Sequence, residues 1–318
     1  MSILQKYLHK LTHLNCATTT YGKAPHKPIL LITIIELIEN GHISDNKIHV
    51  DTDLVGLFQE NWRLLVRTLN LPDFTQPFYY LQSEKLDGIP IWYLKPHVNC
   101  QINSYIKSIN TLIKVVDFGY FKEDLYSLLA DPITCLMLKL ALLDRYFPET
   151  KPYYLDSKNN GNGYMHDLEE YVLNEPQTEY KTIDINTEED IFVRGGLFKK
   201  LVPKVYNNTC CITGMRLEST YRHNFIDACH IIPFSITHDD KVNNGLALCP
   251  NLHRAFDRGL VSIDLTYKVE VSKHVNENYE HPYSLFHLNG MTINLPLNKQ
   301  YYPSKDNLNW HRINIFKS

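Results

Sequence analysis

The segment 227–259 constrains the fold of this 318-residue chain more than any other. A short apolar run ends at His230, an Asn-Gly pair begins at Asn244, and a His-x-x-x-Asp pair, His253 and Asp257, comes next. Residues four apart share one face of a helix, so His253 and Asp257 point the same way if this part is helical. Imidazole and carboxylate groups on one face suit a divalent cation. The segment therefore predicts a strand, a turn and a helix that presents metal ligands.

The composition and length place this segment in a larger globular protein. The chain is 44% hydrophobic and 21% charged, which excludes a mainly disordered or collagen-like protein, and its length predicts two domains. The longest apolar run, 29–38, contains Glu36 and is too short to span a membrane. The N-terminus shows no signal-peptide pattern, and the seven cysteines are an odd number. We expect reduced thiols, a cytoplasmic location and no membrane association.

The net charge of −3 argues weakly against nucleic-acid binding, because affinity for phosphates needs a basic surface. The stretch from Lys181 to Ser318 is slightly basic, whereas the residues before it are acidic. Any case for a nucleic-acid substrate therefore depends on motifs and on local patches of charge.

The periodicity of apolar residues predicts an α+β chain. We expect helices over 2–13, 28–39, 51–68, 197–206 and 252–257, a helical stretch over 103–149 broken at Asp131-Pro132, a hairpin of strands 78–81 and 89–94, and strands near 210–212, 225–230 and 261–272. The β-branched residues of 28–39 also suit a buried strand, but the length and the Asn40-Gly41 stop favour a helix. Polar, glycine-rich sequence near Lys151–Thr187 marks the linker region. We expect an N-terminal mixed α/β domain over 1–170, a linker over 171–187 and a second domain over 188–318.

The arrangement at 227–259 resembles the HNH nucleases of the ββα-metal fold. The similarity runs from about Arg194 to Ser318, and includes Arg194-Gly195-Gly196-Leu197-Phe198, Cys211-Ile212-Thr213-Gly214 and Asn309-Trp310-His311-Arg312. It implies that the C-terminal domain is a ββα-metal endonuclease.

That resemblance assigns chemical roles. His230 is expected to be the general base, since an imidazole with a pKa near ~6.5 accepts a proton from water at neutral pH. His253 and Asp257 are expected to hold Mg²⁺ or Mn²⁺, and Asn244 to fix the loop and orient His230. Cys229 stands where many HNH enzymes have an acid.

Asp227 is the carboxylate closest to that position and is a candidate third ligand. It lies three residues before His230, on the opposite face of an alternating strand, so a cap or turn role is the alternative.

Many HNH enzymes also carry a zinc knuckle of two Cys-x-x-Cys pairs. Here Cys211-x-x-Gly214 and Cys249-x-x-Leu252 each lack the second cysteine, so we expect no structural zinc. Cys210, Cys211 and Cys249 are interpreted as small buried hydrophobic residues.

The N-terminal half resembles the sulfur-binding domain of McrA-like, modification-dependent restriction enzymes, in which that domain precedes an HNH domain. The resemblance covers about residues 1–170 and rests on three stretches: Gly22–Gly41, Pro77-Phe78-Tyr79-Tyr80-Leu81-Gln82, and Asp87-Gly88 through Trp92.

By that resemblance, His26 and Lys27 contact a modified DNA backbone, and Pro77 and Phe78, with Tyr80, form an apolar cup. The sulfur of a phosphorothioate is larger and more weakly hydrated than oxygen, so such a cup beside a cation prefers it. Gln76 replaces an expected aromatic residue and Lys27 an arginine. Core packing of Phe78 and Tyr80, and a solvated charge at Lys27, are the alternatives.

Together these resemblances predict an endonuclease that binds modified double-stranded DNA, with phosphorothioate as the first candidate and a methylated base as the second. A homodimer is the simplest assembly for cutting both strands. Cations near the motif are expected to contact phosphates, with a solvated face as the alternative: Arg194, Lys199, Lys200 and Arg258. The rival hypotheses are a sequence-specific restriction enzyme and a modified-DNA binding protein that has lost cleavage.

Overall fold

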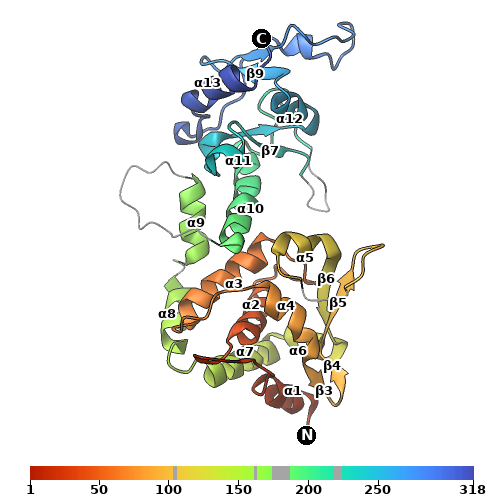
Figure 1. Ribbon diagram of the computed structural model, residues 1–318, viewed down its shortest axis with the longest axis vertical. Coiled ribbons are helices and arrows are strands. Elements are labelled where there is room, and N and C mark those ends of the chain that lie inside the picture. The colour runs from red at the N-terminus through yellow and green to blue at the C-terminus, as the bar shows by residue number, and fades with distance from the viewer. Residues whose placement is uncertain (103–105, 161–162, 174–186, 218, 220–223) are drawn as a thin grey trace. The chain divides into compact units, whose positions relative to one another are not determined.

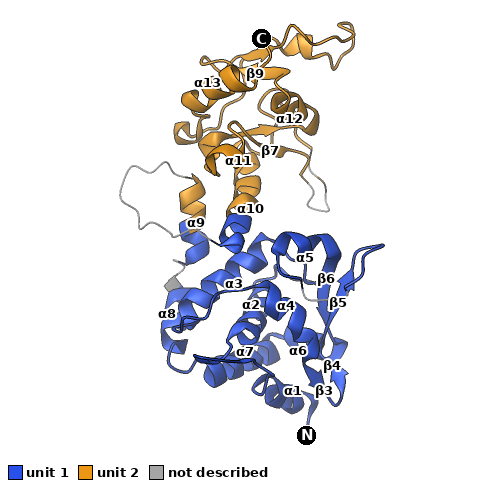
Figure 2. Ribbon diagram, in the orientation of Figure 1, with its two compact units in different colours: residues 1–167, 185–193 blue, residues 168–184, 194–318 orange. Residues whose placement is uncertain are grey.

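The computed structural model describes residues 1–102, 106–160, 163–173, 187–217, 219 and 224–318 (Figure 1). The chain forms two compact units, and Figure 2 shows unit 1 (1–167 and 185–193) and unit 2 (168–184 and 194–318) in different colours. Helix α9 (Tyr164–Leu173) and helix α10 (Glu188–Val205) each contribute to both units. Most of the expected linker, 171–187, falls outside the described residues. Residues 188–193, expected to open the second domain, pack with unit 1.

Unit 1 is built around one buried helix, α2 (His26–Glu39). Nearly every position from Lys27 to Leu37 is buried, because a helix that is apolar on all sides must be surrounded by other elements. The helices that pack around it and complete the unit are α1 (Ile3–Leu11), α3 (Thr52–Leu65), α4 (Thr75–Tyr80), α5 (Ile109–Val115), α6 (Glu123–Ala130), α7 (Pro132–Tyr146) and α8 (Lys151–Asn160). The helix expected over 28–39 is therefore confirmed.

Three antiparallel strand pairs complete unit 1: β1 (Thr18–Thr19) with β2 (Gly22–Lys23), β3 (Lys85–Leu86) with β4 (Ile89–Pro90), and β5 (Trp92–Pro96) with β6 (Val116–Phe121). The strand expected over 78–81 is wrong, since helix α4 continues there into a 3-10 turn, Leu81–Ser83. The hairpin turn is Asp87-Gly88, and both residues have positive φ, as a tight two-residue turn requires. Strand β6 also corrects the helical expectation for 103–149, because its residues pair with β5.

Unit 2 contains a hairpin followed by a helix. Strand β7 (Asp227–His230) pairs antiparallel with β8 (Gly245–Leu248), so that His230 lies opposite Gly245, and helix α12 (Pro250–Asp257) follows. The other elements are α11 (Phe234–Thr237), 3-10 turns Val242–Asn244, Leu285–Leu288 and Lys299–Tyr301, the pair β9 (Val261–Ile263) and β10 (Val269–Val271), and α13 (Lys305–Asn314). Residues 210–212, expected to be a strand, form a turn. The molecule is α+β, as expected.

Among the described residues, no single helix is long and apolar enough to span a membrane. Helices α6 and α7 meet the criteria of length and hydropathy only when taken together, and they are bent by 101°.

Candidate active site

His230 lies at the end of β7, and its ring contacts Phe198, Phe234 and Asp240. The ring stacks on Phe198 of α10, with centroids 3.8 Å apart and planes 8° from parallel. The Nε2 atom of His230 lies 3.0 Å from Oδ1 of Asp240, a side chain in the loop before β8 that is 1% exposed. The ring is therefore held on one face and at one edge, and remains partly accessible to solvent.

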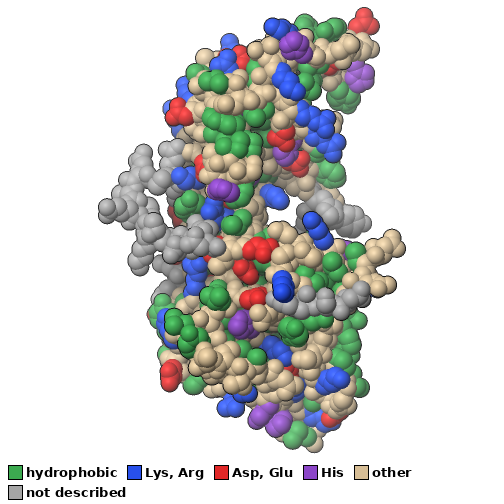
Figure 3. All heavy atoms as spheres, viewed as in Figure 1, with side chains coloured by type: hydrophobic (Ala, Val, Ile, Leu, Met, Phe, Trp, Pro, Cys, Tyr) green, Lys and Arg blue, Asp and Glu red, His purple; other side chains and the backbone are tan. Residues whose placement is uncertain are grey.

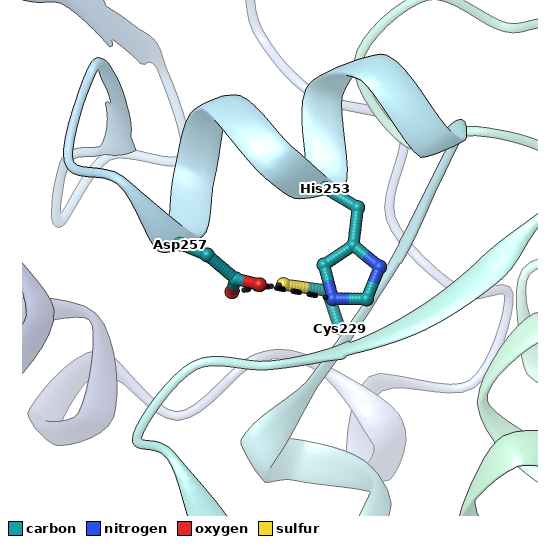
Figure 4. A group of neighbouring side chains, drawn as sticks. All are labelled: Cys229, His253 and Asp257. Carbon is teal, nitrogen blue, oxygen red and sulfur yellow. Dashed lines mark hydrogen bonds and ion pairs between the residues drawn. The ribbon is translucent and has the colours of Figure 1, made fainter.

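His253 and Asp257 lie one turn apart on α12, and Cys229 of β7 points towards them (Figure 4). The Nε2 atom of His253 is 3.5 Å from Oδ2 of Asp257, and the Cys229 sulfur is 3.7 Å from Oδ1 of Asp257. The ligand atoms of all three residues lie within 4.8 Å of one another. Burial and the carboxylate of Asp257 raise the pKa of the Cys229 thiol.

This donor set fits a divalent metal. An imidazole nitrogen, a carboxylate oxygen and a sulfur are the ligand types that borderline metals such as Zn²⁺, Mn²⁺ and Co²⁺ accept, whereas Mg²⁺ prefers oxygen alone. His253 and Asp257 would hold the ion, and Cys229 becomes a ligand if its thiol is deprotonated.

Asp227 is placed differently from the metal ligand that the sequence predicts. Its Oδ2 atom lies 3.1 Å from Nδ1 of His253, the ring nitrogen that does not face Asp257. Residues 227 and 229 point to the same side of β7, towards α12, so Asp227 meets the His253 ring. A carboxylate on the second nitrogen of a metal-binding histidine fixes the ring orientation and its tautomer. Asp227 is therefore placed to orient the His253 ring, and this contact differs from the one expected of a metal ligand.

One cavity of about 320 Å³ joins the base and the metal-ligand group. Its lining includes His230, His253 and Asp257, together with His311 and Ile315 from the C-terminal end of the chain. The cavity therefore places the expected base, His230, and the candidate metal ligands around one space.

Asn244 holds the loop between the two strands. Its side chain accepts a hydrogen bond from the Ile232 amide at 2.9 Å and donates to the carbonyls of Ile232 and Asp239, each at 3.0 Å. Asn307 of α13 donates a further bond to Asn244 at 3.0 Å, a contact that sequence reasoning missed. Asn244 is fully buried, and the backbone on both sides of it is fixed.

Of the four cations expected to contact phosphates, Arg194 lies in the interior. It is 6% exposed, and its guanidinium donates to Asp240 at 3.3 Å and to the His238 carbonyl at 2.8 Å. The phosphate contact expected of Arg194 does not fit this burial. Lys199, Lys200 and Arg258 are exposed.

Charge on the surface is mixed. On the face seen in Figure 3, Lys and Arg side chains lie among Asp and Glu and form no single basic stripe. On this face, contacts to phosphates would therefore depend on small local groups of cations.

The cysteines expected to form only apolar packing include one contacting pair. Cys210 and Cys249 share a hydrogen bond. This bond and the hydrogen bonds from Thr213 lower the pKa of the Cys210 thiol. Cys211 is fully buried. Cys210, rather than Cys211, is therefore the residue that contacts Cys249.

Unit 1 contains a second cavity, of about 510 Å³, which gathers most of the predicted reader residues. Its lining includes His26, Lys27, Gln76, Pro77 and Tyr80, and the same cavity is bordered by Cys16 and by Lys23 of β2. Helix α2 begins at this cavity and helix α4 forms part of its wall. Two segments that are about fifty residues apart therefore meet at one site.

Lys27 does not offer its charge to this cavity. It is 8% exposed, and its ammonium group donates to the Asn15 carbonyl, the Ser83 hydroxyl and the Glu84 carboxylate. These three acceptors use all three protons of the ammonium group. The backbone contact expected of Lys27 does not fit this geometry, whereas the Lys23 side chain at the rim is exposed.

Phe78 also departs from its expected place. It is fully buried and packs edge-on against Trp92. Because residues 75–80 are helical, Pro77 and Tyr80 lie three positions apart on the cavity side, while Phe78 turns into the core. Tyr80 is 46% exposed, and both Pro77 and Tyr80 line the cavity. These two residues therefore form the apolar wall to which Phe78 was expected to contribute.

His26 has a polar but uncharged contact. Its Nε2 atom donates to the Leu71 carbonyl at 2.9 Å, and burial lowers the pKa of the ring, although that hydrogen bond opposes the shift. His26 is therefore neutral at neutral pH and can offer Nδ1 as an acceptor.

The comparison with family models bears on unit 2. No curated protein matches the chain. A solved structure titled "Modification dependent TagI restriction endonuclease" matches with a TM-score of 0.30 and 22% identity, over 37% of this chain and 37% of that one. The chain thus spans little more than a third of that protein. Residues 210–264 match the model of the HNH endonuclease family, so this part of the chain is an HNH endonuclease domain.

Proposed function

We propose that this nuclease is a modification-dependent DNA endonuclease, in which unit 1 recognises modified double-stranded DNA and unit 2 cuts it. The observation that carries the proposal is the 510 Å³ cavity of unit 1, because it unites His26, Gln76, Pro77 and Tyr80 from separate segments. A phosphorothioate is the modification that its chemistry favours.

The cavity combines features that distinguish sulfur from oxygen. Pro77 and Tyr80 offer an apolar surface, His26 a neutral polar contact, and Lys23 an exposed cation at the rim. Sulfur is larger and more weakly hydrated than oxygen, so it loses less solvation on entering an apolar wall. The negative charge of the modified linkage lies near Lys23, and the positive charge of the Lys23 ammonium group attracts it.

In unit 2, each residue has one task in a one-metal hydrolysis. His230 takes a proton from the attacking water, and Asn244 holds the loop on which that geometry depends. His253 and Asp257 would bind the metal, with Asp227 orienting the His253 ring. When bound, a divalent metal polarises the scissile phosphate and stabilises the leaving oxygen.

A binding titration tests the proposal. One duplex sequence is prepared in three forms, with ordinary phosphates, with a phosphorothioate of defined stereochemistry and with methylated bases, and both binding and metal-dependent cleavage are measured. We expect the phosphorothioate duplex to bind at least about tenfold more tightly and to be cut preferentially. Tyr80→Ala should remove this preference, whereas Tyr283→Ala, which removes an exposed tyrosine of unit 2, should preserve it.

The rival functions predict different outcomes of the same titration. Equal affinity for all three duplexes, with cleavage that depends on base sequence, would indicate a sequence-specific restriction enzyme. Preference for methylated bases would replace the phosphorothioate assignment. Selective binding without cleavage in Mg²⁺, Mn²⁺, Co²⁺ or Ni²⁺ would indicate a non-cleaving reader.

A further inference from the structure

The geometry points to Asp240, held by Arg194, as the positioning residue of His230. We infer that Asp240 keeps the neutral His230 ring protonated on Nε2, so that Nδ1 carries the lone pair that accepts the proton of the attacking water. This inference rests on the proposed role of His230 as general base, and it assigns a task to two residues outside the His-Asn-His motif.

The first step is the contact between the imidazole and the carboxylate. Nε2 of His230 and Oδ1 of Asp240 are 3.0 Å apart, which is a hydrogen-bond distance. An ionised carboxylate only accepts hydrogen bonds, so the proton of a neutral His230 must be on Nε2. Because Asp240 is 1% exposed, water does not compete for this oxygen.

The second step is the support of Asp240 itself. A buried carboxylate is costly unless it is paired, and the Arg194 guanidinium lies 3.3 Å from its other oxygen, Oδ2. Arg194 also donates to the His238 carbonyl at 2.8 Å, which fixes the guanidinium. The two carboxylate oxygens are therefore divided: Oδ2 faces Arg194 and Oδ1 faces His230.

The third step is the orientation of the ring plane. Phe198 lies four residues after Arg194, so both side chains leave α10 on one face. Phe198 stacks on the His230 ring at 3.8 Å, while the Asp240 contact limits rotation of the ring. One helix thus fixes both the plane of the ring and the carboxylate that sets its tautomer.

These contacts define where the proton goes. An O–H bond of water breaks, its proton moves to Nδ1, and the oxygen forms a bond to phosphorus as the bond to the leaving oxygen breaks. The ring is then an imidazolium, and Asp240 stabilises its positive charge while Arg194 keeps the carboxylate in place. The leaving oxygen takes its proton from solvent.

The variant Asp240→Asn tests this assignment. Because Arg194 needs an acceptor, the oxygen of the introduced amide should face Arg194 and its NH₂ group should face Nε2 of His230. The ring would then carry its proton on Nδ1 and lose its function as a base. We expect the single-turnover cleavage rate to fall at least about 100-fold, as in other enzymes with an Asp–His pair, while DNA affinity changes little. The melting temperature should fall as well, because Arg194 loses its buried charged partner, so the rate is measured at a temperature where the variant is folded.

The neighbouring acid provides the matched control. Asp239 is more exposed, and its carboxylate accepts a bond from the amide of Lys241, away from the ring. Asp239→Asn should keep the rate within about twofold of the unaltered protein. An unchanged rate in Asp240→Asn, or an equal loss in both variants, would overturn the proposal.

Nitrogen NMR of the ¹⁵N-histidine protein tests the tautomer without any variant of Asp240. The His230 signal is identified by its disappearance in His230→Gln, and it is recorded at a pH where the ring is neutral. We expect the Nε2–H pattern, and an Nδ1–H pattern would contradict the proposal even if Asp240→Asn fails to fold. If His230→Ala still cleaves DNA, the proposed function of His230 fails, whereas the NMR result remains interpretable.

Discussion

Each unit contains a buried cation that is paired with a buried carboxylate, and the two pairs differ in what lies beyond the carboxylate. In unit 2, the Arg194–Asp240 pair ends on the ring of His230. In unit 1, the carboxylate of Glu84 holds Lys27, and its other contacts are Lys10 and the backbone amide of Asn15.

The environment of Glu84 shows what its pair does. Burial alone would raise the pKa of Glu84, but hydrogen bonds and charges from Lys10 and Lys27 outweigh it and lower the pKa. Among the described residues, the Glu84 carboxylate contacts no histidine ring and no other side chain that we propose to be catalytic. The comparison teaches that the carboxylate of a buried ion pair can contact either a ring that borders a cavity or structural groups alone, and the cation by itself does not distinguish the two.

The largest expected effect is the loss of chemistry in unit 2. His230→Ala removes the base and should lower the cleavage rate by about 10²–10⁴-fold, since a general base contributes that much. DNA affinity should change little, because His230 is proposed to act on the attacking water and unit 1 is proposed to recognise the DNA. The measurement is single-turnover cleavage, with a binding titration beside it. Full activity in this variant would mean that the Arg194–Asp240 pair does not position a catalytic base.

Removing the cation of the unit 1 pair should instead affect folding. Lys27→Met leaves Glu84 buried with one fewer partner and should lower the free energy of unfolding by about 3 kcal/mol or more. Lys23→Ala is the matched control: Lys23 is exposed, so its loss should weaken DNA binding, reduce the salt slope by about one and leave stability unchanged. Unfolding is measured with urea. A Lys27→Met variant that is fully stable yet binds DNA poorly would restore the reader role first expected of Lys27.

A third buried group, His311, has no carboxylate partner among the described contacts and should respond to pH in the opposite way to a paired histidine. It is 1% exposed, and burial lowers its pKa to about 4 although a bond to the Phe256 carbonyl opposes the shift. In the unfolded chain the His311 ring binds a proton near pH ~6.5, whereas in the folded chain it does so only when the pH falls to about 4. The stabilisation is therefore complete above about pH 6.5 and is lost as the pH falls towards 4, by up to about 3 kcal/mol.

Urea unfolding at about pH 7 and about pH 4.5, with chelator present, measures this loss in the full chain. His311→Gln should show a smaller change in stability between the two pH values than the unaltered protein. Equal changes in both proteins would show that other groups cause the pH dependence.

The smallest expected effect separates the half-buried carboxylate Asp227 from the buried carboxylate Asp240. Asp227→Asn weakens the orientation of His253 and should lower metal affinity about 10–100-fold, as removal of such a partner usually does. Metal affinity is measured by calorimetric titration. Asp240→Asn should leave that affinity within about threefold, and a loss of metal binding in both variants would mean that the two carboxylates act on one site.

Local sequence was sufficient where the contacts are local. The spacing of His230, Asn244 and the His253–Asp257 pair predicted a hairpin and a helix, because one antiparallel turn and one helical turn determine which side chains meet. The central helix over 28–39 was predictable for the same reason, since its apolar run is too long for an ordinary strand and ends at Asn40-Gly41.

The expectations that failed depended on distant partners. Phe78 was expected at the cavity, but the helical conformation of 75–80 turns it to the core against Trp92. Strand β6 was missed because its strand character depends on pairing with β5, about twenty residues earlier. The role of Asp227 was open until the structure placed it beside His253.

The sequence by itself determined the hairpin and the helix that carries His253 and Asp257, because those residues lie within one short segment. Only the tertiary structure decided which cations are available to DNA. Arg194 and Lys27 carry the same charge in the sequence as Lys199 and Lys23, but Asp240 and Glu84 hold the first two inside the protein. The partner of Arg194 lies 46 residues away in the sequence and the partner of Lys27 lies 57 residues away. Because these contacts are so distant, no local sequence pattern indicates which cations are buried and which remain exposed.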